Sequence, residues 1–174
     1  MRSWTEDNIN IYQSPNGIVR RGLIDGNNSP SGDGIMVESG AAAEHEHADC
    51  LVKDVDLVNQ GNGPFGAWGV ANVTCADCRI LTTHCEGFDG RGPPSSGALA
   101  FAGGNEGDIF SSNIRISGAV MNGLCNPSNL FWPSEAFSEM DATSDESFPE
   151  AKYQPLYLEF CWEQARTNVL FSVQ

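Results

Sequence analysis

The chain has 174 residues, a length that suits one domain with a substantial core. Its 9 lysine and arginine residues stand against 23 acidic residues, and the net charge of −14 argues against binding to nucleic acid or anionic lipid. Hydrophobic residues make up 40% of the chain and charged residues 18%, so the composition indicates a folded protein. The 19 glycines predict many tight turns and no long helices.

The first residues of the chain carry no apolar segment of the kind found in signal peptides, and no later apolar run is long enough to span a membrane. We therefore expect either a protein that stays in or is assembled in the cytoplasm, or a piece of a longer exported one. The six cysteines are too sparse for a disulfide scaffold. The single CxxC motif, Cys75 and Cys78, is followed so soon by His84 and Cys85 that little room is left for the usual second half of a zinc site, so we interpret Cys75 and Cys78 as small core residues.

An alternating pattern of apolar residues first occurs near residue 18 and then recurs three times. The four copies are separated by 33, 23 and 41 residues, which indicates a basic unit lengthened by loops in two cases. Aligning the copies places their apolar residues in three columns. The columns are Val19, Val52, Cys75 and Ile116; Gly22, Val55, Cys78 and Ala119; and Ile24, Leu57, Ile80 and Met121.

A second apolar strand follows each copy after a turn rich in glycine and asparagine. Ile35, Trp68 and Trp132 each lie 11 residues after the third column, whereas the third copy reaches Leu99 only after a longer loop. We therefore expect Trp68 and Trp132 to share a buried column with Ile35, although an exposed tryptophan would serve as a platform for a sugar. A unit of two short strands cannot bury its apolar face alone, so the units must stack as the coils of a solenoid.

The segments Ile18–Asn28 and Asn72–Ile80 resemble coils of the right-handed parallel β-helix superfamily, the pectate-lyase-like fold. The resemblance implies an all-β, right-handed parallel β-helix of about four to five coils with loop excursions, as one domain over residues 1–174. We expect coils over about 8–132, an acidic loop excursion over about 133–155 and final strands over about 156–174. Within the excursion, Phe137 and Met140 are candidate anchors for a short amphipathic helix.

The resemblance implies two functional classes, the tailspikes of bacterial viruses and the enzymes that act on polysaccharides. Four or five coils leave apolar ends that need a cover, and cytoplasmic assembly of a virion keeps thiols reduced. We therefore expect a structural or receptor-binding module of a phage virion: a tailspike, fibre or head-decoration element. It would contact surface glycans or neighbouring virion subunits as a homo-oligomer, specifically a trimer, and would end in the virion or the extracellular space. A purely structural cement protein is a third reading.

The enzymatic alternative is a polysaccharide lyase, hydrolase or C5-epimerase that acts in a groove on the β-helix face. One loop collects a histidine, two carboxylates and a cation suited to acid and base chemistry on a sugar: His84, Glu86, Asp89 and Arg91. Asp25 flanks the first turn and is a candidate to line the same groove. The sequence contains no complete catalytic motif of polygalacturonases or mannuronan epimerases. The net charge of −14 favours neutral or amino-containing glycans over polyuronates.

Two pairs of residues are candidate metal ligands. His45 and His47 would point to the same side of an extended strand, as two ligands of one metal require. Asp54 and Asp77 occupy equivalent outward positions and would stack one coil apart, with Arg21 above Asp54. Stacked like charges repel each other, so a calcium ion, water or Arg21 would be needed to relieve the repulsion. We expect no other cofactor, and Cys50 and Cys125 fall in none of the columns.

Overall fold

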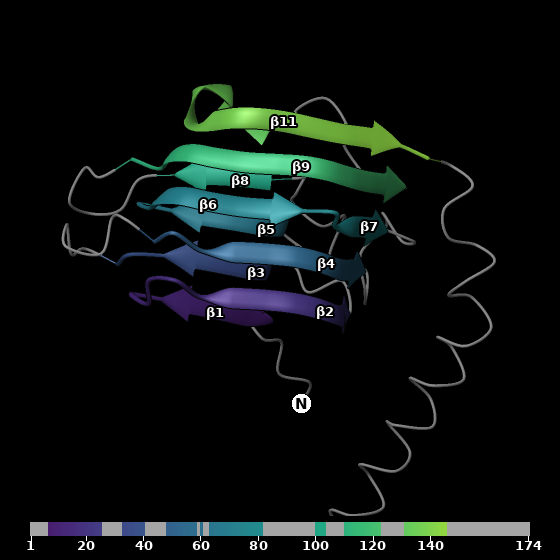
Figure 1. Cartoon of the computed structure of the whole chain (residues 1–174), viewed down its shortest axis with the longest axis horizontal. Coiled ribbons are helices and arrows are strands. Elements are labelled where there is room, and N and C mark those ends of the chain that lie inside the picture. The colour runs from purple at the N-terminus through teal and green to yellow at the C-terminus, as the bar shows by residue number, and fades with distance from the viewer. Residues whose placement is uncertain are drawn as a thin grey trace, which may run out of the picture.

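In a computed structural model the chain is all-β and forms two parallel sheets (Figure 1). The structure describes residues 7–25, 33–40, 48–58, 60, 63–81, 100–103, 110–122 and 131–145. Sheet A contains, in spatial order, β1 (Ile9–Tyr12), β3 (Asp33–Glu38), β5 (Gly63–Trp68), β8 (Ala100–Gly103) and β10 (Phe131–Trp132). Sheet B contains, in the same direction, β2 (Ile18–Asp25), β4 (Leu51–Val58), β6 (Ala71–Ala76), β9 (Ser112–Asn122) and β11 (Phe137–Ser144). The short strand β7 (Arg79–Leu81) follows β6 in the chain and, like β6, pairs with β4 and β9.

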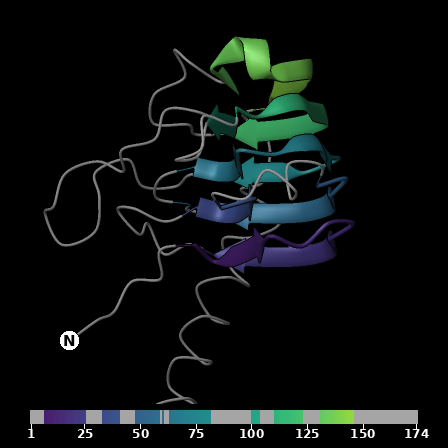
Figure 2. The ribbon, with the colours of Figure 1, turned by 90° about the vertical axis from the view of Figure 1, so that its left-hand side faces the viewer.

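The chain alternates between the two sheets and advances by one strand with each return. Figure 1 shows the strands of sheet A pointing opposite to those of sheet B, and Figure 2 shows the resulting coils stacked in one direction. Every pairing between neighbouring strands is parallel. The expected all-β class is confirmed, and the alternating parallel strands are compatible with a solenoid.

The register of sheet B follows the columns expected from the repeat. Val19 pairs with Val52, which pairs with Cys75, which pairs with Ile116. The third column is also in register, from Ile24 through Leu57 and Ile80 to Met121, and Gly22 lies opposite Val55 in the second. These columns supply the sheet B side of the core, because Val52, Val55 and Leu57 are fully buried. Burying each such side chain contributes roughly 1.5–3 kcal/mol.

The expected column on sheet A is wrong. Ile35 pairs with Phe65, while Trp68 pairs with Glu38 and Gly103, and Trp132 pairs with Phe101. The cause is the length of the connection between the sheets: it takes 11 residues from Ile24 to Ile35 but only 8 from Leu57 to Phe65. Since side chains alternate along a strand, the shift of three residues puts Phe65 into the core and Trp68 on the outer face.

Two rows of left-handed residues mark the same two positions in four successive coils. The first row lies at the start of each sheet B strand: Asn16, Asp49, Asn72 and Asn113, with φ of 62°, 48°, 61° and 52°. The second row lies five residues later, within or after the strand: Arg21, Asp54, Asp77 and Gly118, with φ of 57°, 54°, 54° and 62°. Asparagine, aspartate and glycine are the residues that adopt this conformation most readily, so most of both rows suits the backbone. Each row therefore marks a bend of the backbone that recurs at the equivalent position of each repeat.

A strand also occupies part of the expected acidic excursion. Strand β11 pairs with β9, and its register shifts between Phe137 and Glu139 and again between Met140 and Ala142. Phe137 is buried and meets the Phe131 ring edge-on at 5.5 Å between centroids. The amphipathic helix expected here is replaced by the strand and by a single 3-10 turn, η3 (Ser134–Ala136). The final strands expected over 156–174 lie outside the described residues.

Candidate functional site

Most of the residues expected to carry chemistry lie outside the part of the chain that the structure describes. These residues are His84, Glu86, Asp89 and Arg91 of the expected catalytic loop, the histidines His45 and His47, and Cys125. Asp25 is described: it is the last residue of β2, half-buried, and pairs with Val58 of β4. The described candidates are therefore Asp25, Asp54 and Asp77, together with the side chains that lie near them in the folded sheets.

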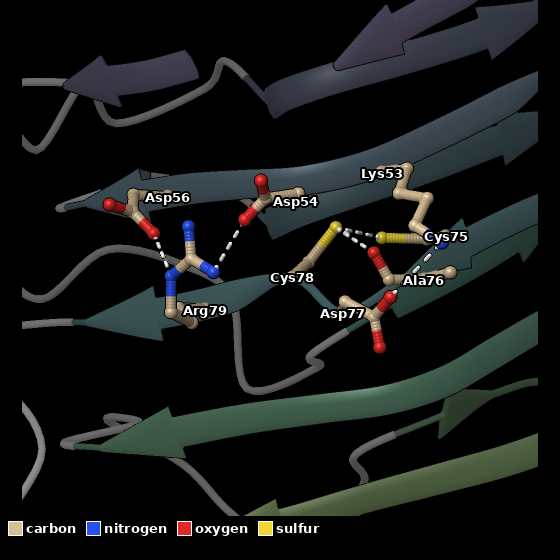
Figure 3. Close-up of polar contacts among 8 residues, drawn as sticks. All are labelled: Lys53, Asp54, Asp56, Cys75, Ala76, Asp77, Cys78 and Arg79. Atoms are coloured by element: carbon tan, nitrogen blue, oxygen red, sulfur yellow. Dashed lines mark hydrogen bonds and ion pairs between the residues drawn. The ribbon is translucent and has the colours of Figure 1, made fainter. Parts of the chain in front are cut away.

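Asp54 and Asp77 occupy equivalent positions in neighbouring coils of sheet B. Both have φ of 54°, and each follows one member of the pair Lys53 and Ala76, which lie opposite each other. The Nζ atom of Lys53 lies 3.4 Å from a carboxylate oxygen of Asp77, and both side chains are more than half exposed (Figure 3). The stacking expected from the sequence therefore brings Asp77 beside a cation on the neighbouring strand.

Arg79 bridges two carboxylates across the strands β7 and β4. Its Nη1 donates to Asp54 Oδ1 at 2.7 Å, and its Nε donates to Asp56 Oδ1 (Figure 3). Burial alone would lower the pKa of the Arg79 guanidinium, but the hydrogen bonds to Asp54 and Asp56 outweigh burial and raise it above its ordinary value. The sequence pointed to Arg21 as the cation beside Asp54; the role of Arg79 was not predicted, although Arg79 is the outward residue directly after the second column.

These ion pairs make the outer face of sheet B a structural surface. Among the described residues, no group of three or more histidine, cysteine, aspartate or glutamate side chains is placed to hold a metal ion. The carboxylates of Asp54, Asp56 and Asp77 are matched by cations from adjacent strands. The arrangement joins one coil to the next through charged hydrogen bonds, which are stronger than neutral ones.

The described cysteines lie in the core, as the columns predicted for Cys75 and Cys78. The Cys75 thiol donates to Cys78 Sγ at 2.9 Å, and the Cys78 thiol donates to the Ala76 carbonyl (Figure 3). This contact, together with burial, raises the pKa of Cys75, and the same contact lowers the pKa of Cys78. Cys50, which had no place in the columns, is also buried and donates to the carbonyl groups of Ala48 and Ser14.

The outer face of sheet A carries a different row of side chains. Tyr12, Glu38, Trp68 and Gly103 lie opposite one another on the neighbouring strands β1, β3, β5 and β8. Tyr12 is 53% exposed, and Glu38 and Trp68 are half-buried. The Asn10 amide donates to Glu38 Oε1 at 2.6 Å and so holds the carboxylate toward β1. We call Tyr12, Glu38 and Trp68 the aromatic row.

Glycines make room for both rings of the aromatic row. A Cβ atom at Gly103 would lie inside the van der Waals envelope of the Trp68 ring, so the ring extends over β8. A Cβ atom at Gly40 would lie 2.5 Å from the Tyr12 hydroxyl, and Gly40 itself has a φ of 63°. Tyr12 and Trp68 stand two strands apart, which is about 9.5 Å along the sheet. The glycines thus allow the two aromatic side chains to lie across the backbone, and Glu38 stands on the strand between them.

The aromatic row was not predicted from the sequence because Trp68 was aligned with Ile35. The signal that identifies it is the shorter connection into β5, which changes the side of the sheet on which Trp68 emerges.

Comparison of the chain with protein-family models, with curated proteins and with solved structures finds no match. Within the described ranges, no helix has the length and hydropathy needed to cross a bilayer.

Proposed function

We propose that this chain is a right-handed, pectate-lyase-like β-helix module of a phage virion or a similar extracellular assembly, and that it binds surface glycans through the outer face of sheet A. Crossover connections between parallel strands of one sheet are right-handed in nearly all proteins, which supports that hand for a chain alternating between parallel sheets. The module supplies a rigid support, and its role is recognition rather than catalysis.

The aromatic row is the observation that carries this proposal. A pyranose ring has an apolar face of C–H groups and a rim of hydroxyl groups. Aromatic side chains such as Tyr12 and Trp68 contact the apolar face, and a fixed carboxylate such as Glu38 accepts hydrogen bonds from the hydroxyl groups. Because the Asn10 amide already holds Glu38 in place, little conformational entropy is lost when a sugar binds.

The charge of the chain narrows the class of glycan. A net charge of −14 repels polyuronates and other acidic polysaccharides over long distances. Neutral and amino-containing glycans avoid this repulsion, and a protonated amino sugar would be attracted to Glu38. We therefore propose neutral or amino-containing bacterial surface polysaccharides as the ligands.

The test is binding of the full chain to a panel of neutral, amino-containing and acidic bacterial polysaccharides, measured by calorimetry. Trp68→Ala and Tyr12→Ala should each weaken binding about tenfold, which is about 1.4 kcal/mol of binding free energy. Phe110→Ala is the matched control, because Phe110 is 70% exposed and lies outside the aromatic row. Binding that is absent for the whole panel, or that survives both aromatic substitutions, would overturn the proposal.

The same mixtures report on the enzymatic alternative. Release of oligosaccharides that stops with His84→Ala or Glu86→Ala, while the fold is retained, would replace the binding role by a polysaccharide lyase or hydrolase. Inversion at C5 of the sugar without chain cleavage, lost in the same variants, would replace it by an epimerase. Polysaccharide that is neither cleaved nor epimerised after prolonged incubation agrees with a binding module.

A further inference from the structure

The two edges of sheet B carry opposite charges. Arg20 and Arg21 are exposed on β2 at one edge, and Glu139 and Asp141 are exposed on β11 at the other (Figure 1). Among the described residues, no strand pairs with the outer side of β2 or of β11. Unpaired edge strands present rows of free backbone donors and acceptors, and they are the usual place where another strand is added.

The charges of the two edges lie at the same level of the repeat. The second left-handed row runs from Arg21 through Asp54 and Asp77 to Gly118, and the Gly118 backbone amide donates to Asp141 Oδ2 at 3.0 Å. Asp141 is therefore the β11 residue that continues this row. A further strand added to β11 with the sequence and register of β2 would bring Arg20 and Arg21 opposite Asp141, with Glu139 close by.

The apolar side chains at these edges are also open to solvent. Ile18 and Leu23 of β2 are 63% and 44% exposed, and Met140 of β11 is 49% exposed. Val19 and Ile24 are only partly buried, whereas their column partners Val52 and Leu57 are fully buried. Met140 pairs with Ile116 and so stands in the column that begins with Val19. Adding β2 to β11 would place Val19 against Met140 and extend the core columns.

We propose that a second copy of this chain stacks end to end on the first, with its β2 paired in parallel with β11 of the first copy. Sheet B then continues across the boundary, and the basic edge of one copy meets the acidic edge of the other. Such a contact joins two different surfaces, so each added copy exposes a new edge and the assembly can grow. The proposal concerns a different face from the aromatic row and does not depend on glycan binding.

The overall charge sets the conditions for stacking. A net charge of −14 makes whole copies repel each other when salt is low. At about 0.15 M salt the Debye length is about 8 Å, so this long-range repulsion is screened while adjacent charges still attract. Association should therefore be measured at that ionic strength.

Charge reversal tests the proposal. The variant R20E/R21E makes both edges acidic, and the variant E139K/D141K makes both edges basic. Sedimentation velocity of the full chain over a range of concentrations should show species heavier than the monomer for the unaltered protein and only monomer for each variant alone. An equimolar mixture of the two variants should recover the heavier species, because each acidic edge then meets a basic one.

Two further variants separate stacking from loss of folding. Lys53→Glu reverses one exposed charge on the same sheet, one strand inside the edge, and should associate like the unaltered protein. Ile18→Gln leaves the charge unchanged but removes an exposed apolar side chain, and should weaken association severalfold. Circular dichroism confirms the fold of each variant.

Two results would overturn the stacking proposal. One is an unaltered chain that stays monomeric at every concentration, as it would if another segment of the chain covers these edges. The other is an oligomer of fixed size, such as a trimer, that both charge-reversal variants still form. Neither result bears on the glycan measurements, so the two proposals can fail separately.

Discussion

The outer faces of sheets A and B share one set of coils but bear different side chains. On sheet B, charged residues reach from one strand to the next, as Arg79 does to Asp54 and Asp56. On sheet A, the rings of the aromatic row lie against glycines, Trp68 against Gly103 and Tyr12 against Gly40. The face of sheet B is thus occupied by its own internal contacts, while the proposed function assigns glycan binding to the face of sheet A. If that proposal holds, stabilisation and recognition are divided between the sheets.

Replacing the largest core side chain should have the strongest effect and should act on both sheets. Phe65→Ala removes a fully buried ring from sheet A, and we expect it to lower the free energy of unfolding by about 3–5 kcal/mol. Leu57→Ala, in the facing sheet B, should cost about 2–5 kcal/mol. Urea denaturation followed by circular dichroism measures both. A loss below about 1 kcal/mol at either position would mean that the two sheets do not share a close-packed core.

The ion pairs of sheet B should differ in strength according to their burial. Asp56 is buried and accepts from Arg79, so Asp56→Asn should lower the free energy of unfolding by about 1.5–3 kcal/mol. Lys53 and Asp77 are more than half exposed, so Lys53→Gln should cost no more than about 1 kcal/mol. Denaturation in low and high salt checks both values. If the two substitutions cost the same, the outer face of sheet B does not stabilise the coils through the Arg79 bridge.

Gly103→Ala, which adds a methyl group beneath the Trp68 ring, should weaken glycan binding more than it lowers the free energy of unfolding. Gly103→Ala places a Cβ atom against the far end of the Trp68 ring, which can move outward, so we expect a stability loss of about 1 kcal/mol. Glycan affinity should fall because the ring no longer lies across the strand. Denaturation and calorimetry on the same sample separate the two effects. An unchanged affinity beside a clear loss of stability would assign Trp68 to the packing of the fold.

The smallest expected effect is an alkaline decrease in stability that arises from Cys50. Burial raises the pKa of the Cys50 thiol, a hydrogen bond from the Gly17 backbone lowers it less, and the charge of Asp49 adds to the increase. In the unfolded chain the thiol ionises at a pKa of about 8.5. Above that pH the unfolded state loses a proton that the folded state keeps, so the free energy of unfolding falls as pH rises toward the folded pKa.

Comparison with Cys50→Ala isolates this contribution. The stabilisation provided by Cys50 should be complete below about pH 8.5 and should decrease above it. Denaturation of both proteins at several pH values measures the difference. A difference that stays constant through pH 10 would show that the thiol is not desolvated in the folded state.

The sequence predicted the strand register correctly where the offset between two copies of the repeat stays the same along the whole strand. One set of offsets aligns Val52 with Cys75 and Leu57 with Ile80, because sheet B contains no insertion between its core columns. It failed for Trp68, whose position depends on the length of a turn that varies from coil to coil. The left-handed rows were also missed, although Asn16, Asp49, Asn72 and Asn113 follow the same offsets as the apolar columns.

The candidate site was less predictable than the fold. Its residues come from separate coils, and Glu38 and Tyr12 have no individual signal in the sequence until the register of sheet A is known. The expected stacking of Asp54 on Asp77 identified the part of sheet B that carries the ion pairs. It did not identify Arg79, because Arg79 and its partner Asp54 lie on different strands and form no short sequence motif. The strand β11 was missed because two register shifts interrupt its alternating pattern.

The two left-handed rows also define how long a segment must be if it is to be duplicated without disturbing the stack. The interval from Asp49 to Asn72, 23 residues, is the shortest distance between equivalent bends among the described residues, and it contains one complete passage through both sheets. Copying residues 49–71 in tandem would therefore insert a whole coil without shifting any later residue relative to the bends. Each inserted copy would lengthen the stack by about 4.8 Å, so the height of the molecule becomes an adjustable dimension.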